Sequence, residues 1–313
     1  MPPRVLALIV NWNGAEVLEK TVRSLKESDY PQLQITVVDN ASADASADEV
    51  QSRYPEVRVL RLAENRGFAG GHNAGLALAL AEGFDYALLL NNDVLLEREA
   101  LTRLVDCAEV GPRAAVLAPA LRCADSPALL DSAWGQILYH HVIVRTLGVR
   151  QQPAGRYRKE RAVDCVFGAV LLLRCRTLPE TGLLDERFWM FLEEVEFCRR
   201  VRRFGYQVRY CPAARAYHLG GHSIRRAGAD RLKLYLVRRN SVLFLRRHGR
   251  PWHWAFFLLC VALSLGASLL ACAAGGRLPF WQARWEGYRD GFLGRLLPPD
   301  LLFGKYAARK ADP

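Results

Sequence analysis

The sequence predicts an α/β fold in which a mostly parallel sheet carries helices on both faces. Short apolar runs alternate with stretches of helical periodicity between residues 5 and 90. A cluster of Asn, Asp or Gly follows most of the apolar runs. Strands and helices in strict alternation, with polar turns between them, are typical of parallel sheets.

Each element of this alternation is expected from its own pattern. Continuous or alternating apolar residues predict strands, and apolar residues three or four positions apart predict helices. The expected strands are Val5–Val10, Leu33–Asp39, Val57–Leu62 and Tyr86–Leu90, and the expected helices are Glu16–Lys26, Asp44–Tyr54 and Asn73–Ala81.

The second half of the chain has a less regular pattern. It predicts a strand within Val163–Leu173, a helix from about Glu193, a short strand at Tyr206–Cys211, a loop at Tyr217–Ser223, a basic helix at about Asp230–His248 and a tail helix within Trp281–Leu297. We therefore divide the chain into an α/β domain of residues 1–225 and a C-terminal helical region of residues 226–313.

Charge and cysteine content indicate which partners and which cellular compartment to expect. The formal net charge is +11, and arginines are dense between residues 199 and 250. Such a region suits a phosphorylated substrate, an anionic lipid surface or a nucleic acid, but no nucleic-acid reading module accompanies it, so we expect no nucleic-acid partner. The cysteines form no Cys-x-x-Cys pair, which favours reduced, buried thiols in a cytosolic protein.

One segment predicts membrane contact. Residues 255–274 carry no charge and are long enough to cross a bilayer, and arginines flank them on both sides. Basic residues on both flanks assign no orientation, so a full span and an in-plane helical hairpin both remain open. The alternative is a buried core helix. The apolar run at residues 5–10 is too short for a signal peptide, which favours the cytoplasmic side of the membrane.

Polar residues gather where the predicted strands end. Asn11 follows the first strand, Asp39 ends the second, residues 64–75 follow the third, and Asn91, Asn92 and Asp93 end the fourth. Ligands of open parallel sheets bind beyond the carboxyl ends of the strands. Any one of these clusters could be ordinary turn chemistry, but together they predict a nucleotide site. The glycines of residues 67–75 would let main chain approach a diphosphate and lead into a helix N-terminus.

Two residues are candidate metal ligands. Asp93 would hold Mg²⁺ or Mn²⁺ against phosphate oxygens. His218 and His222 form a His-x-x-x-His pair, but Glu is absent at position 219 and two glycines interrupt the helix that a zinc protease would need. A lone loop histidine is usually structural, so His218 matters only as a partner of Asp93.

A third candidate group is the acidic cluster Glu193, Glu194 and Glu196, which follows a bulky apolar run and begins a helix. The helix dipole favours an ionised carboxylate at that position, and such a group can serve as a general base. Acidic residues are also common at helix starts for purely structural reasons.

Taken together, the motifs resemble the family 2 glycosyltransferases of the GT-A fold, notably the bacterial rhamnosyltransferase-like group, over about residues 4–250. The matching motifs are Ile9–Gly14, Val37–Ser42, Glu64–Gly71, Leu89–Asp93, Gly168–Ala169, Leu184–Phe188 and Tyr217–His218. The usual Glu-Asp-x-Asp motif reads Glu193-Glu194-Val195-Glu196 in this chain, so both Asp positions carry Glu.

The resemblance implies a role for each candidate residue. Donor-binding residues would be Asn11, Asp39, Asn65, Arg66, Gly67, Gly71, Asn73, Asn91 and Asn92; metal ligands Asp93 and His218; the catalytic base Glu194; and acceptor-side residues Trp189, Glu193 and Glu196. The implied activity is inverting transfer of a sugar from dTDP-rhamnose or a UDP-sugar to a hydroxyl of a glycan acceptor, with Mg²⁺ or Mn²⁺. The C-terminal membrane segment suggests that this acceptor is lipid-linked, and we expect the protein at the cytoplasmic face of the inner membrane. The alternative is a non-catalytic nucleotide-sugar-binding or scaffold protein at the membrane.

Overall fold

The computed structural model describes residues 1–219, 230–275 and 278–306. The chain divides into two compact units. The first, here called the sheet unit, comprises Met1–Gln136, Thr146–Glu186 and Glu194–His222; the second, the helical unit, comprises Ile137–Arg145, Arg187–Glu193 and Ser223–Pro313. The sequence did not predict that residues 137–145 and 187–193 would join the C-terminal unit.

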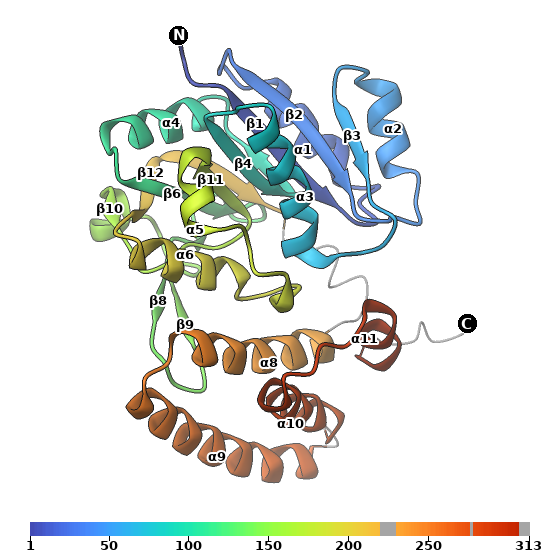
Figure 1. The fold of residues 1–313 in the computed structure, drawn as a ribbon, viewed down its shortest axis with the longest axis vertical. Coiled ribbons are helices and arrows are strands. Elements are labelled where there is room, and N and C mark those ends of the chain that lie inside the picture. The colour runs from blue at the N-terminus through green and yellow to red at the C-terminus, as the bar shows by residue number, and fades with distance from the viewer. Residues whose placement is uncertain (220–229, 276–277, 307–313) are drawn as a thin grey trace. The chain divides into compact units, whose positions relative to one another are not determined.

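The sheet unit is built on a mixed sheet (Figure 1). Strands β1 (Val5–Asn11), β2 (Leu33–Asp39), β3 (Arg58–Arg61) and β4 (Tyr86–Asn91) are parallel and lie in the order β3-β2-β1-β4. Next to β4 comes the antiparallel β11 (Val170–Arg174), then β6 (Ala114–Cys123), β12 (Gln207–His218) and β10 (Arg161–Ala162). The short strands β5 (Val94–Leu96) and β7 (Leu130–Ser132) pair with β12 and β6, and β8 (Trp134–Ile137) pairs with β9 (Val144–Leu147).

Helices cover both faces of this sheet. The side chains of β1 alternate between the two faces, so this strand contacts helices on each of them. Val5, Ala7 and Ile9 share one buried cluster with apolar residues of α1 (Leu18–Lys26) and α4 (Ala100–Val110). On the other face, Leu8 and Val10 lie against α3 (Gly67–Ala81). The remaining helices of the sheet unit are α2 (Ser46–Arg53), α5 (Leu178–Thr181) and α6 (Glu193–Arg203), with 3₁₀ turns at Gly155–Arg158 and Cys175–Thr177. A further 3₁₀ turn, Glu186–Phe188, begins at the last residue of this stretch of the sheet unit and continues into the helical unit. The predicted α/β class is confirmed.

Two predicted boundaries are wrong. Helix α3 begins at Gly67 rather than Asn73, so the glycines that we expected in a loop form its first turns. Strand β12 runs to His218 instead of ending at Cys211. A register shift between Cys211 and Arg215 absorbs Pro212, and the strand then continues beside β6 and β5.

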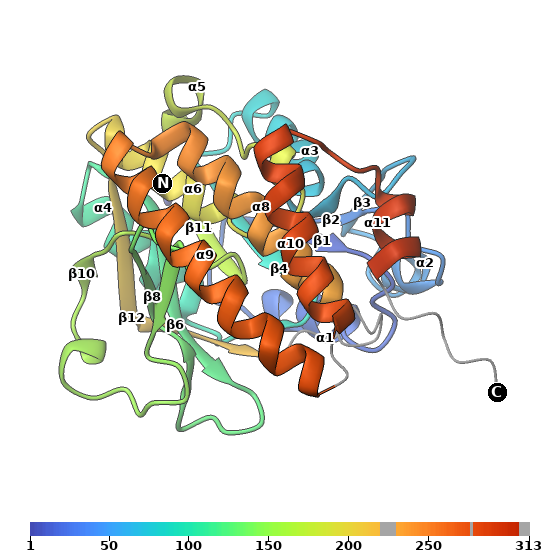
Figure 2. The same cartoon turned by 90° about the horizontal axis from the view of Figure 1, so that it is seen from below.

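The helical unit contains α8 (Asp230–His248), α9 (Pro251–Ala274), α10 (Leu278–Leu293) and α11 (Pro299–Tyr306). Figure 2 shows α8, α9 and α10 side by side. Helix α10 packs on α8 through Gly287 and Gly291, where a Cβ atom would lie under 3.0 Å from the carbonyl oxygens of Tyr235 and Arg239. Two glycines four positions apart therefore let the two helix backbones approach closely.

Helix α9 packs antiparallel to α10 along its length. Phe257 contacts Tyr288, and Arg284 donates to Ser264 Oγ at 2.8 Å. Within the described residues, Pro251–Leu269 is the one stretch of helix long and apolar enough to cross a membrane; its mean hydropathy is 1.6 and only 17% of it is buried.

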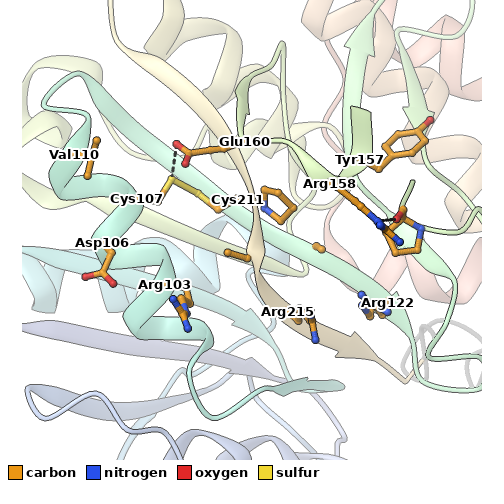
Figure 3. Close-up of a pocket in the computed structure, with 14 residues that line it drawn as sticks. Arg103, Asp106, Cys107, Val110, Arg122, Tyr157, Arg158, Glu160, Cys211 and Arg215 are labelled. Atoms are coloured by element: carbon orange, nitrogen blue, oxygen red, sulfur yellow. Dashed lines mark hydrogen bonds between the residues drawn. A yellow bond between two sulfur atoms is a disulfide. The ribbon is translucent and has the colours of Figure 1, made fainter. Parts of the chain in front are cut away.

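The cysteine prediction needs a correction. Cys107 of α4 and Cys211 of β12 form a disulfide, with their Cα atoms 6.9 Å apart. The pair borders a cavity of about 640 Å³ in the sheet unit, lined also by Arg103, Arg122 and Glu160 (Figure 3). None of the predicted site residues lines this cavity. Cys123, Cys165, Cys175 and Cys198 are buried free thiols, as expected.

Candidate functional site

The strand-end asparagines bind one another. Asn11 Nδ2 donates to Ser46 Oγ at 2.8 Å, and Asn92 Nδ2 donates to Asn11 Oδ1 at 2.9 Å. Both asparagines are buried, with 0% and 5% of their surface exposed. Their amides are thus used to join the ends of β1 and β4 to the start of α2. Asn91 is half-buried beside them, and its main-chain N–H donates to Ala169 O.

Asn40 links β2 to α3, a role that the sequence did not predict. Its Nδ2 donates to Asn65 Oδ1 and to Gly67 O, both at 3.0 Å, and its Oδ1 accepts the main-chain N–H of Arg66 at 2.9 Å. Asn40 is 2% exposed. This residue therefore fixes the approach to α3, and its position directly after Asp39 was the available signal.

Asp39 stands at the carboxyl end of β2, opposite Asn11 of β1. Its Oδ1 accepts the N–H of Ser42 at 3.4 Å, and its Oδ2 lies 3.7 Å from Arg61 Nη1. The carboxylate is therefore held at the edge where a parallel sheet binds ligands.

The first turns of α3 are anchored to residues 184–186. Asn73 Nδ2 donates to Leu184 O and Glu186 Oε1, each at 2.9 Å, and Arg66 Nη2 donates to Glu186 Oε2 at 2.8 Å. At Gly71 a Cβ atom would lie 2.8 Å from Val10 Cγ1. Gly71 thus serves the close packing of α3 on β1, and the expected glycine loop is a helix start.

Asp93 and His218 come together at the ends of β4 and β12. His218 Nε2 lies 3.4 Å from Asp93 Oδ1, within ion-pair distance. Asp93 is 3% exposed. A buried carboxylate beside an imidazole nitrogen fits a divalent cation, since Mn²⁺ and Mg²⁺ prefer oxygen ligands and Mn²⁺ also accepts imidazole. His222 lies outside the described residues.

Asp131 of β7 completes this group and was not predicted from the sequence. Its Oδ2 lies 3.3 Å from His218 Nδ1. Burial alone lowers the pKa of His218, but hydrogen bonds and charges from Asp131 and Asp93 outweigh it and raise this pKa to about 9. A carboxylate on the far nitrogen of a ligating histidine orients the ring toward a metal. Asp131 lies beside His218 because β7 pairs with β6, which is the neighbour of β12 in the sheet. No local sequence pattern predicts this strand pairing.

The acidic cluster lies at the start of α6, as predicted. Glu193 is 3% exposed and Glu194 is 9% exposed. Glu196 is fully buried and forms an ion pair with Arg200, whose Nη2 also donates to Leu183 O at 2.7 Å. We expected Glu196 on the acceptor side, but its burial and its ion pair favour a structural role.

The segment before Glu193 has a strained main chain. Trp189, Phe191 and Leu192 have φ values of 60°, 70° and 67°. A left-handed conformation costs a non-glycine residue about 1–2 kcal/mol. Trp189 is 8% exposed and packs within the helical unit against Phe303, with ring centroids 5.7 Å apart. Its predicted contact with an acceptor stays a prediction.

Comparison with known proteins decides the family. The model of glycosyl transferase family 2 matches residues 7–170, more than half of the chain. The chain belongs to glycosyl transferase family 2. It is therefore a glycosyltransferase, and the match includes Asp39, residues 65–73 and Asp93, whereas Glu194 and His218 lie beyond it.

Relatives of this glycosyltransferase include enzymes of glycan synthesis. It is 27% identical over 261 residues to the N-acetylglucosaminyl-diphospho-decaprenol L-rhamnosyltransferase of Mycobacterium tuberculosis, covering 78% of this chain and 84% of the relative. It is 23% identical to the low-salt glycan biosynthesis hexosyltransferase Agl10 of Haloferax volcanii, covering 67% of this chain and 66% of the relative.

Solved structures of glycosyltransferases share its fold. The mannosyltransferase PcManGT from Pyrobaculum calidifontis, in complex with GDP-Man and Mn²⁺, aligns with a TM-score of 0.55 and 18% identity over 94% of this chain and 88% of that one. GalNAc-T7 with UDP, GalNAc and Mn²⁺ aligns with a TM-score of 0.58 and 16% identity over 77% of this chain and 51% of that one. The GT-A fold is thereby confirmed.

Proposed function

We propose that this glycosyltransferase moves a sugar, with inversion, from dTDP-rhamnose or a UDP-sugar to a hydroxyl of a lipid-linked glycan acceptor in cell-surface polysaccharide synthesis. The observation that carries the proposal is the Asp93–His218 pair, 3.4 Å apart at the carboxyl edge of the sheet. Similarity to the N-acetylglucosaminyl-diphospho-decaprenol L-rhamnosyltransferase supports both rhamnose as the sugar and a lipid-linked glycan as the acceptor.

Each step has a candidate group. Asp39 would accept hydrogen bonds from the donor base or ribose at the end of β2. Glu194 would remove the proton of the acceptor hydroxyl, and the resulting oxygen attacks the anomeric carbon as the nucleoside diphosphate leaves. A divalent cation held by Asp93 and His218 would supply positive charge to the departing diphosphate. Asp131 would keep the imidazole of His218 directed at that cation.

The test is a transfer assay with purified protein. Nucleotide-sugars are first screened for thermal stabilisation with and without Mn²⁺, and the best donor is then incubated with a polyprenyl-diphosphate-linked sugar. We expect transfer that stops in excess chelator and in Asp93→Ala, and returns for the parent protein with added Mn²⁺. Full transfer in chelator would rule out the metal role. Donor binding without transfer to any acceptor would favour the non-catalytic binding protein, which the Glu193-Glu194-Val195-Glu196 motif also allows.

We also propose that the helical unit holds the enzyme on the cytoplasmic face of the membrane with α9 in the plane of the interface. The outward side of α9 is apolar, with Phe256, Leu259 and Leu263 51%, 58% and 65% exposed. If α9 crossed the bilayer, α10 beside it would carry charges such as Arg284 and Glu286 into the hydrocarbon, at a high cost. An in-plane helix avoids that cost, and flanking arginines suit anionic headgroups.

Vesicle flotation tests the membrane proposal. The parent protein should float with vesicles that contain phosphatidylglycerol, and a triple variant Phe256→Ser, Leu259→Ser, Leu263→Ser should stay at the bottom of the gradient. Unchanged flotation of the triple variant would contradict α9 as the membrane-binding helix. Ala262→Ser on the same helix is the control, because it removes little apolar surface.

A further inference from the structure

Two adjacent buried side chains of α8 bind the main chain just before the acidic cluster. Arg239 Nη2 donates to the carbonyl oxygens of Arg187 at 3.0 Å and Phe188 at 2.8 Å. Asn240 Nδ2 donates to the carbonyl oxygens of Phe188, Met190 and Phe191 at 2.9, 2.8 and 2.6 Å. Arg239 Nε also donates to Asn240 Oδ1 at 2.9 Å, so the two side chains support each other.

The segment that they hold contains the left-handed residues Trp189, Phe191 and Leu192. Such conformations persist only where the surroundings impose them, and they gather at functional sites. Arg239 and Asn240 are 1% and 0% exposed. Neighbours on the same helix that serve only packing are apolar, such as Leu236 and Val242. Because Arg239 and Asn240 donate to main-chain carbonyls, they fix the backbone conformation of this segment in addition to filling space in the core.

The held segment runs directly into α6, which begins at Glu193. Phe191 and Leu192 are therefore joined directly to the first turn of α6, which carries Glu194. We propose that Arg239 and Asn240 are positioning residues for sugar transfer: by fixing residues 187–192 they set the position of the Glu194 carboxylate. The inference rests on the proposed role of Glu194 as base.

The first experiment separates the chemical step from donor binding. Asn240→Ala removes the amide that binds the three carbonyls, and a misplacement of the base by about 1 Å can cost roughly 100-fold in rate. We expect kcat about 10–100-fold lower and the donor dissociation constant within about 2-fold of the parent. Ser241→Ala is the matched control: Ser241 is 1% exposed and its hydroxyl donates only within α8, to Val237 O. It should retain the parent kcat.

A double-mutant cycle then asks whether Asn240 acts through Glu194. In a Glu194→Gln background, Asn240→Ala should change the residual rate by less than about 3-fold, because the base is already absent. A loss of the same factor in both backgrounds would overturn the proposal, as would an unchanged kcat in Asn240→Ala. If Glu194→Gln alone left transfer intact, the base assignment would be at fault instead of the positioning role.

Folding is checked by circular dichroism before kinetics. If Asn240→Ala does not fold, Arg239→Lys replaces it in the same cycle. Lysine keeps the buried positive charge, but its single nitrogen cannot occupy the positions of both Nε and Nη2, so the planar fork that binds Asn240 and the two carbonyls is lost. The expected pattern is the same, with lower kcat, unchanged donor affinity and little further effect in Glu194→Gln. Parent kcat in Arg239→Lys would overturn the proposal.

Discussion

The strand-end asparagines of the sheet unit and the 187–192 segment of the helical unit are held in opposite ways. Asn11 and Asn92 bind side chains on neighbouring strand and helix ends, so their geometry follows from the sheet itself. The 187–192 segment has its carbonyls bound by α8 side chains 49 to 52 residues further along the chain. Damage to the first network should appear mainly as lost stability. Damage to the second should appear mainly as lost rate.

A related case lies within the sheet unit. Arg200 of α6 pairs with Glu196 and donates to the carbonyl oxygens of Thr181 and Leu183, as Arg239 does for residues 187 and 188. Here, however, an acid on the same helix neutralises the cation. The Leu183 carbonyl lies next to Leu184, whose main chain is bound by Asn73. This arginine thus ties the acidic helix to the start of α3.

The largest expected effect concerns the residue that the 187–192 segment would position. Glu194→Gln keeps size and hydrogen bonding but cannot accept a proton. Since a general base contributes a factor of about 10² to 10⁴, transfer should fall by that factor while donor affinity is kept. The check is the initial rate of transfer with donor affinity from calorimetry. Glu193→Gln is the control and should do less harm. The reverse order, with Glu193→Gln inactive and Glu194→Gln active, would assign the base to Glu193.

The next effect tests the buried ion pair of α6. Arg200→Ala leaves Glu196 as a buried charge without its cation, and breaking such a pair costs about 3–5 kcal/mol in the free energy of unfolding. Urea denaturation followed by circular dichroism measures this cost. Lys20→Ala, at an exposed cation on α1, should change stability by no more than about 0.5 kcal/mol. Equal stabilities of the two variants would show that the ion pair contributes nothing.

A smaller effect tests the contact that positions α8 within the helical unit. Gly287→Ala places a methyl group against the Tyr235 carbonyl and should destabilise the protein by about 1–3 kcal/mol through overpacking. Gly266→Ala is the matched control, because within the described residues nothing outside the backbone of α9 itself lies within 4 Å of the added Cβ. Alanine there should be neutral or stabilising, by up to about 1 kcal/mol. Thermal unfolding in the same detergent compares the two, and similar melting temperatures would contradict close α8–α10 packing.

Much of the fold could be predicted because β1 to β4 and the helices between them show local periodicity. The pattern failed at α3 because glycines usually mark loops, whereas Gly71 is needed for close packing on Val10. It failed at β12 because Pro212 reads as a strand end, although a register shift absorbs it. Both errors arise where tertiary contacts override a local signal.

The candidate site was predicted in outline but not in its internal roles. Asp93 and His218 were predicted as partners and lie 3.4 Å apart, while their role as metal ligands stays a prediction. Sequence alone could not distinguish residues that face a ligand from residues whose side chains are buried and bound to other side chains. Asn11, which donates to Ser46, and Glu196, which pairs with Arg200, are of the second kind. Nor could it find Asp131 or Asn240, because their contacts join segments that are far apart in the chain.

The last prediction returns to the sheet unit and concerns pH. The pKa of His218 is raised from its ordinary value of 6.5 to about 9. A raised pKa means that the protonated form stabilises the folded, metal-free protein; this stability is fully present below pH 6.5 and is lost as the pH rises through about 9. A metal must displace that proton, so Mn²⁺ affinity should rise about tenfold per pH unit between pH 6.5 and 8.5. Asp131→Asn removes one of the acids that raise this pKa. The Mn²⁺ affinity of this variant should therefore depend less on pH than that of the parent protein. Asp125→Asn is the control, since this exposed acid pairs with Arg150. Calorimetric titration with Mn²⁺ across this range is the measurement, and an affinity independent of pH would show that His218 does not bind the metal.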